Sequence, residues 1–182
     1  MMEALCPGVQ AIRSELGDRW FFQYLLTGTQ RSLLVDTGMK DTPERVILPA
    51  LKQAGVVPEW ALITHADLDH LAGNPAIKSA FPSLTLLGPE ADARWIESCD
   101  AIHRERYGWY AAEGIDYPPE LHQAIRDNWI PDTPLDRKLR GGETLDLGGV
   151  VWRVLAIPGH TPGHLGLYDP SSRVAIITDA LN

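Results

Sequence analysis

The sequence predicts an α/β fold with chemically active side chains at the ends of its strands. Short apolar runs alternate with segments typical of helices, which is the pattern of an α/β domain. Three of these runs lead into a histidine or an aspartate: 60–64 before His65, 150–155 before the loop of His160, and 174–178 before Asp179. Because open α/β sheets place their sites at the carboxyl ends of strands, we expect these side chains to meet.

The first third of the chain predicts three strands and a helix. β-prone residues indicate strands over 9–16, 20–27 and 31–36, separated by turns that contain glycine. Threonine followed by proline at 42–43 is a typical helix start, and the helix is expected to stop at Gly55. The remaining expected elements are strands over 60–64, 84–87, 150–155 and 174–178 and helices over 89–98 and 119–129.

The stretch after the strand over 60–64 concentrates metal-binding groups. His65, Asp67, Asp69 and His70 fall within six consecutive positions. His65 and Asp67 point the same way if the backbone stays extended, whereas Asp69 and His70 converge only if the chain turns. The alternative is that both aspartates cap a helix and the histidines are incidental. Four such groups in so short a stretch favour a metal site.

Two further strand ends strengthen that interpretation. Pro158 and Gly159 permit a tight turn that brings the imidazole of His160 close to a shared centre, and His164 follows in the same loop. Asp179 stands at the end of the last apolar run. Three separate strands therefore end in candidate metal ligands.

These motifs together resemble one known family. The stretch His65-Ala66-Asp67-Leu68-Asp69-His70 is similar to the His-x-His-x-Asp-His signature of the metallo-β-lactamase superfamily. The resemblance continues in Val35-Asp36-Thr37-Gly38, in the loop from Pro158 to His164 and in Thr178-Asp179-Ala180, and it runs from about residue 8 to the end. It implies an αβ/βα sandwich in one domain, 1–182, apparently truncated at its C-terminus.

The resemblance also implies a binuclear metal site. The implied metal ligands are His65, Asp67 and His160 in the first site, Asp69 and His70 in the second, and Asp179 as the bridge. A metal-bound hydroxide would be the nucleophile, and Asp69 would also orient the water and so act in catalysis. Asp36 matches a residue that supports the ligand loops, and His164 matches a histidine that holds its loop by hydrogen bonding.

Asp67 departs from the family, which usually has histidine at this position. An added carboxylate makes a harder site, so the two divalent ions would be zinc or, more in keeping with oxygen ligands, iron or manganese. Flavodiiron proteins carry an acid there too, although theirs is glutamate. Asp67 would alternatively bind through a water or leave the first site weak. If Asp67 binds directly, its replacement by histidine should raise zinc affinity, as metal content would show.

The end of the chain is the second departure, because no histidine follows Asp179. The family normally supplies one more histidine to the second metal. The expectation is that the chain is a piece of a longer protein. The alternatives are an incomplete second site or one that a partner subunit completes.

Residues 89–140 lie between two elements of the family core and are expected to form a helical insertion over the site. Their aromatic side chains either shape a substrate pocket or pack two helices together. His103 and His122 are expected to face solvent. Arginines in and near this segment could meet an anionic substrate but more commonly form a solvated face: Arg104, Arg106 and Arg137.

The expected function is metal-dependent hydrolysis of a small ester, thioester or lactone. The alternatives are a di-iron redox protein like the flavodiiron proteins and a non-catalytic metal-binding member of the fold. A net charge of −8 argues against a nucleic-acid partner. No signal peptide or membrane span is visible, so the cytoplasm is the expected location, and a homo-oligomer is left open.

Overall fold

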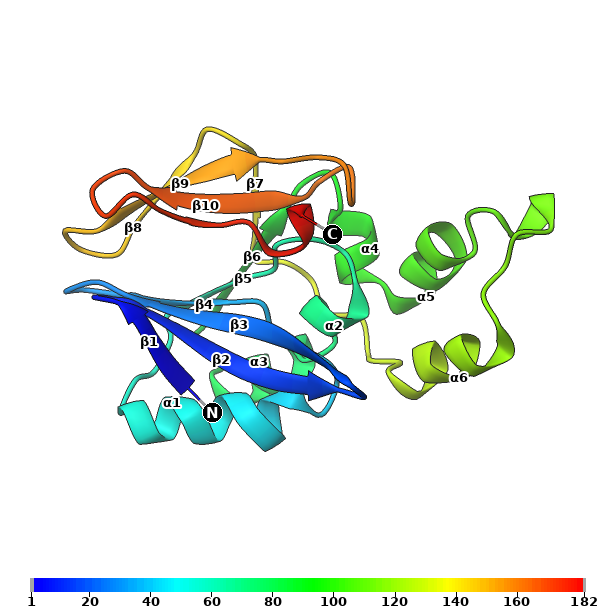
Figure 1. Ribbon diagram of the computed structural model, residues 1–182, viewed down its shortest axis with the longest axis horizontal. Helices are drawn as coiled ribbons and strands as arrows, with labels where there is room; N and C mark the ends of the chain where they lie inside the picture. Colours follow the sequence, from blue (N-terminus) through cyan, green and yellow to red (C-terminus); the bar gives the residue numbers. More distant parts are fainter. Residues whose placement is uncertain (1, 182) are drawn as a thin grey trace.

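Two β-sheets pack face to face in the computed structural model, which describes residues 2–181 (Figure 1). The larger sheet has seven strands in sequential order: β1 (Met2–Cys6), β2 (Val9–Leu16), β3 (Arg19–Thr27), β4 (Ser32–Val35), β5 (Trp60–Leu62), β6 (Thr85–Pro89) and β7 (Arg137–Leu139). It is antiparallel from β1 to β4 and parallel from β4 to β7. The smaller antiparallel sheet contains β8 (Thr144–Asp146), β9 (Val151–Ala156), β10 (Leu165–Asp169) and β11 (Val174–Ile176).

Helical segments connect the parallel strands and extend beside the sandwich. They are η1 (Pro43–Ile47), α1 (Leu48–Ala54), α2 (Leu68–Leu71), α3 (Asn74–Ala80), α4 (Ala93–Glu97), α5 (Cys99–Ala101), η2 (Ile102–Tyr107), η3 (Ala111–Glu113), α6 (Pro119–Asp127) and η4 (Thr178–Ala180). Residues 99–129, from α5 through α6, form a helical arm that projects to one side in Figure 1. Within residues 2–181, no helix covers the outer face of the smaller sheet.

The alternation of side chains along the strands builds two cores. In β4, Leu33 and Val35 face the smaller sheet, whereas Leu34 faces the helices, and all three are fully buried. Leu62 and Leu87 repeat the inward position on β5 and β6. Because both faces of the parallel strands are covered, these strands read as continuous apolar runs.

The predicted α/β sandwich is confirmed, with differences at its margins. Pro89 belongs to β6, so the helix expected over 89–98 spans only Ala93–Glu97. Arg137–Leu139 pairs with β6 as β7, so the end of the expected 89–140 insertion belongs to the larger sheet. The strand expected over 174–178 ends at Ile176, and Thr178 adopts a positive φ of 39° in η4.

One buried aspartate, Asp92, ties together two loops that carry candidate ligands. Its Oδ2 accepts hydrogen bonds from the backbone N–H of Ala66, at 3.2 Å, and from the hydroxyl of Thr161. Its Oδ1 accepts from the backbone N–H of Gly163 at 2.7 Å, and a Cβ on Gly163 would lie 2.6 Å from that oxygen. Asp92 therefore fixes the loop after β5 against the loop after β9.

Replacing Asp92 by alanine should lower the free energy of unfolding by about 2–4 kcal/mol, because buried donors in both loops lose their acceptor. Urea unfolding measures the change. The matched control is Asp127→Ala, since Asp127 is exposed and accepts one side-chain hydrogen bond, from Gln123. If Asp92→Ala lowers the free energy of unfolding no more than Asp127→Ala does, Asp92 does not hold the two loops together.

Candidate functional site

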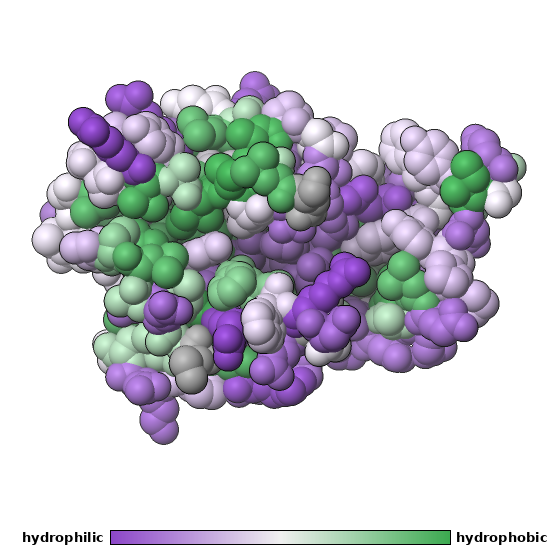
Figure 2. Space-filling view, viewed as in Figure 1, coloured by the Kyte–Doolittle hydropathy of each residue, from purple (hydrophilic) through white to green (hydrophobic). Residues whose placement is uncertain are grey.

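Four histidines cluster where the loops of both sheets meet. The His65 ring centroid lies 4.0 Å from that of His70, 4.8 Å from that of His160 and 4.6 Å from that of His164. In Figure 1, α2 and the last described residues lie at this same edge. Figure 2 shows hydrophilic side chains in the hollow between this edge and the helical arm.

His65, Asp67 and His160 form a first group whose ligand atoms all lie within 4.8 Å of one another. Asp67 Oδ2 lies 2.7 Å from His160 Nε2 and 3.6 Å from His65 Nε2. The expectation that His65 and Asp67 point the same way is therefore correct. Asp67 stands at the N-cap of α2, but its side chain makes no capping hydrogen bond there.

His65, His70 and Asp179 form a second group within the same limit. Asp179 directs Oδ1 toward His70 Nε2, at 3.5 Å, and Oδ2 toward His160 Nε2, at 3.9 Å. One carboxylate thus faces a histidine of each group. Asp69 belongs to neither three-residue group, but its Oδ2 lies 3.6 Å from His70 Nε2.

Buried Asp36 accepts hydrogen bonds that orient two histidines, His70 directly and His65 through the Thr64 hydroxyl. Asp36 accepts from the Thr64 hydroxyl at 2.9 Å and from His70 Nδ1 at 2.8 Å. Because the Thr64 hydroxyl has one proton and gives it to Asp36, it accepts the proton of His65 Nδ1, 3.0 Å away. In the neutral form of each ring Nε2 then carries a lone pair, and the Nε2 of His65 is buried without a hydrogen-bond partner. An orphaned nitrogen among carboxylates fits a metal ion.

His164 holds its loop, as the resemblance implied. Its Nε2 forms a 2.8 Å hydrogen bond with the Thr178 hydroxyl, which in turn lies 3.3 Å from the Thr64 hydroxyl. Burial, together with the neighbouring His65 and His160 imidazoles, lowers the pKa of His164 to about 4. A neutral His164 therefore connects the loop after β9 to η4.

Four carboxylates lie beside the histidines of the site: Asp36, Asp67, Asp69 and Asp179. Burial raises the pKa of Asp69, whereas a hydrogen bond with His70 holds the pKa of Asp179 at about 2. Burial disfavours a charged His70, but the carboxylates of Asp36, Asp179 and Asp69 outweigh it and raise the pKa of His70. Surroundings that draw protons onto an imidazole also attract metal cations.

Arg106 and Tyr107, from η2 in the helical arm, both contact Asp67. Arg106 Nη2 lies 2.9 Å from Asp67 Oδ2, and the Tyr107 hydroxyl lies 3.2 Å from Asp67 Oδ1. The expectation of a solvated face is therefore wrong for Arg106. It is correct for Arg104 and Arg137, which pair with exposed or half-exposed acids on the surface. No motif in the sequence indicated the contact of Arg106 with Asp67 or the hydrogen bonds of Asp92.

His103 and His122 lie away from the site in the helical arm. Both are half-buried, so the expectation that they face solvent is only partly correct. His122 Nε2 lies 2.8 Å from an Asp116 oxygen, and the His103 ring packs 5.8 Å from that of Trp129. Neither belongs to a metal-binding group in the part of the chain that the structure describes.

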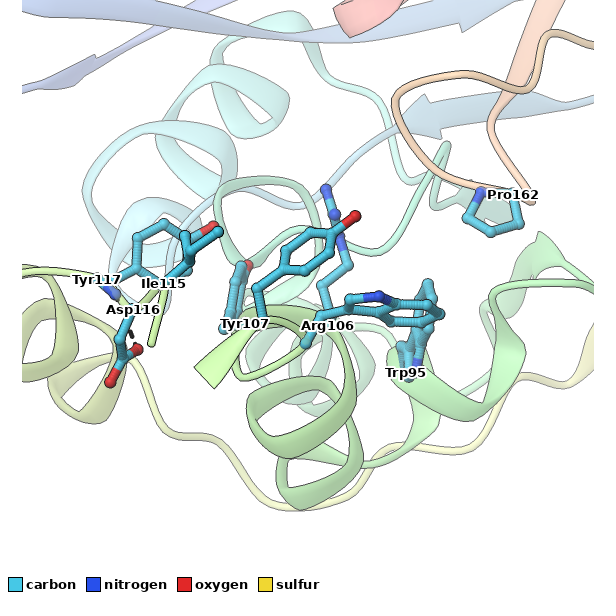
Figure 3. A pocket seen from close by; sticks show the side chains of 9 residues that line it. Trp95, Arg106, Tyr107, Ile115, Asp116, Tyr117 and Pro162 are labelled. Atoms are coloured by element: carbon cyan, nitrogen blue, oxygen red, sulfur yellow. Dashed lines mark hydrogen bonds between the residues drawn. The ribbon is translucent and has the colours of Figure 1, made fainter. Parts of the chain in front are cut away.

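The arm also forms one wall of a cavity of about 380 Å³ beside the first group (Figure 3). The lining residues are Trp95, Arg106, Tyr107, Trp109, Tyr110, Ile115, Asp116, Tyr117 and Pro162. Trp109 and Tyr110 are 60% and 58% exposed, so they are not packing residues of a core. Trp109 and Tyr110 therefore line a pocket, whereas Trp95 and Tyr107 line it and also pack against the core. Pro162 reaches the pocket from the His160 loop.

A second cavity, of about 630 Å³, opens on the other group and is lined by Asp69, His70 and Asp179 together with residues of β3.

Among residues 2–181, the helices are all too short or too polar to cross a membrane.

Two known proteins are similar to this chain in sequence. A hydroxyacylglutathione hydrolase of Mesorhizobium japonicum is 31% identical over 146 residues, which are 80% of this chain and 43% of that protein. The acyl-coenzyme A thioesterase MBLAC2 of Gallus gallus is 26% identical over 87% of this chain and 56% of its own length. The chain thus spans about half the length of these relatives.

Solved structures share the fold. A metallo-β-lactamase family protein of Thermus thermophilus superposes with a TM-score of 0.77 at 24% identity, covering 96% of this chain and 60% of that one. A Cronobacter sakazakii metallo-β-lactamase with a HARLDQ motif gives a TM-score of 0.69 at 21% identity, covering 96% and 62%. The family model described as the metallo-beta-lactamase superfamily matches residues 22–182. This chain belongs to the metallo-β-lactamase superfamily.

Proposed function

We propose that this chain is the metal-binding core of a hydrolase that cleaves small thioesters. The observation that carries the proposal is the convergence of two ligand groups on His65, whose buried Nε2 has no hydrogen-bond partner. Relatives named as hydroxyacylglutathione hydrolase and acyl-coenzyme A thioesterase support a thioester over the other carbonyl substrates.

In this proposal the first metal is held by His65, Asp67 and His160, the second by Asp69 and His70, and Asp179 lies between them. Imidazole nitrogen and carboxylate oxygen suit zinc, iron and manganese. Divalent metals at such a site lower the pKa of water and polarise a carbonyl oxygen. The facing of the two Asp179 oxygens toward His70 and His160 supports its bridging role.

Asp69 is the proposed catalytic carboxylate. It lines the larger cavity beside Asp179, and about a third of its side chain is exposed, so it can reach a water in that cavity. We propose that it orients this water toward the substrate carbonyl.

The aromatic cavity is the proposed site for the apolar part of the substrate. It adjoins Asp67 through Arg106 and Tyr107, and adjoins His160 through the loop of Pro162. A carbonyl placed at the first group would therefore have aromatic rings beside one of its substituents. Flat apolar acyl groups gain most from such surroundings.

Asp179→Ala should lose bound metal and thioester hydrolysis together, because its carboxylate faces both groups. We expect kcat/KM to fall by about 100-fold or more. Elemental analysis measures the metal, and thiol release from hydroxyacylglutathione and acyl-coenzyme A thioesters measures hydrolysis. The Asp127→Ala control should keep both. Full metal occupancy in Asp179→Ala would refute the bridge, and a metal-loaded chain inactive on every thioester would refute the function.

Trp109→Ala should raise KM about tenfold for a phenylacetyl thioester and leave KM for the acetyl thioester nearly unchanged, since only the larger acyl group reaches the pocket. Trp129→Ala is the matched control, because Trp129 is exposed in the same arm but does not line the cavity. Equal effects of the two substitutions would contradict the assignment of the pocket.

A further inference from the structure

The helical arm holds Asp67, the residue at which this chain departs from the family motif. Arg106 Nη2 contacts Asp67 Oδ2, and Arg106 Nε donates to the Ala66 carbonyl at 3.3 Å. The Tyr107 hydroxyl donates to Asp67 Oδ1 and accepts from the backbone N–H of Leu68 at 3.0 Å. Both oxygens of Asp67 therefore have partners from the arm.

Asp67 Oδ2 is shared between the arm and the histidines. The same oxygen lies 2.9 Å from Arg106 Nη2, 2.7 Å from His160 Nε2 and 3.6 Å from His65 Nε2. The side chains of Asp67 and Arg106 are only 14% and 23% exposed, so solvent screens this pair weakly. The guanidinium thus acts on the charge that the first group presents to a metal.

We propose that Arg106 is a counter-charge that makes Asp67 equivalent in charge to the histidine usual at this position. Aspartate and guanidinium together are neutral, as an imidazole ligand is. The pair would therefore keep a first metal site suited to zinc, although a carboxylate stands in the motif. This inference rests on the proposed metal site and makes Arg106 a positioning residue that acts through Asp67.

The proposal reverses the expectation drawn from the sequence for Asp67→His. Histidine at 67 would leave Arg106 beside the metal without its anion, and an unpaired cation there repels a divalent ion. Asp67→His alone should therefore weaken zinc binding, whereas Asp67→His with Arg106→Gln should restore it. This change of sign distinguishes a counter-charge from an arginine that only stabilises the arm.

A double-mutant cycle tests the pair of Asp67 and Arg106. The zinc affinity of each variant is measured by competition with a chelator. We expect Asp67→His to bind zinc about tenfold more weakly than wild type, a loss of about 1.4 kcal/mol in binding free energy, and the double variant to return to within about threefold of wild type. Asp67→His with Arg106→Lys should stay weak, because lysine keeps the charge.

Arg104→Gln is the matched control for Arg106→Gln. Arg104 lies two residues away in the same η2 segment, but it is exposed and pairs with Asp100. Added to Asp67→His, it should not restore zinc binding. Thermal unfolding of each metal-free variant verifies that it is folded and measures any purely structural effect of the pair.

The proposal is overturned if Asp67→His binds zinc as tightly as wild type while Arg106 is present. It is also overturned if Arg106→Gln and Arg104→Gln have the same effect on that variant. A wild-type chain that binds zinc but hydrolyses no thioester would refute the proposed function and leave this cycle measurable. A wild-type chain that binds no divalent metal would overturn both.

Discussion

Carboxylates gathered at a buried edge can remain ionised only where positive charge lies among them. Asp36, Asp67, Asp69 and Asp179 lie at one edge of the sandwich with four imidazoles, and of the described residues Arg106 is the permanent cation in direct contact with them. One guanidinium offsets one carboxylate. The remaining negative charge makes this edge a site for cations, and the other features of the site follow from that constraint.

The fold keeps these groups together by hydrogen bonds between loops. Asp36 joins the loop after β4 to Thr64 and His70, and Asp92 joins the loop after β5 to the loop after β9. The backbone N–H of Leu165, the first residue of β10, also donates to the Thr64 carbonyl at 2.9 Å, which links the smaller sheet to the segment that follows β5. Segments distant in sequence therefore hold their side chains before any ligand arrives, which reduces the entropy lost on binding.

Sequence reasoning predicted the parts of this arrangement that depend on local pattern. The apolar runs before His65 and Asp179 predicted strands, and the resemblance to the family implied which side chains would meet. It missed β10, because Gly166 and the preceding Pro-Gly turn hide a short strand whose pairing comes from β9 and β11. The structure adds that His65 lies within 4.8 Å of the ligand atoms of both groups, which the sequence did not indicate.

The roles of Asp92 and Arg106 could not be read from the sequence for a physical reason. Each acts through contacts across long separations, from Asp92 to Gly163 and from Arg106 to Asp67, and such contacts exist only after the sheets and the arm have packed. The sequence showed the added charge of Asp67 but not the cation that offsets it. The preference for iron or manganese that we expected from the sequence therefore considered Asp67 alone, without its ion-pair partner Arg106.

X-ray diffraction from zinc-loaded crystals, with anomalous data collected at the zinc edge, tests the central claim most directly. The account predicts anomalous peaks among the two ligand groups, with His65, Asp67 and His160 atoms about 2.0–2.3 Å from one peak and Asp179 beside it. Peaks only on histidines away from the site, such as His122, with His65 Nε2 still without a partner, would contradict it.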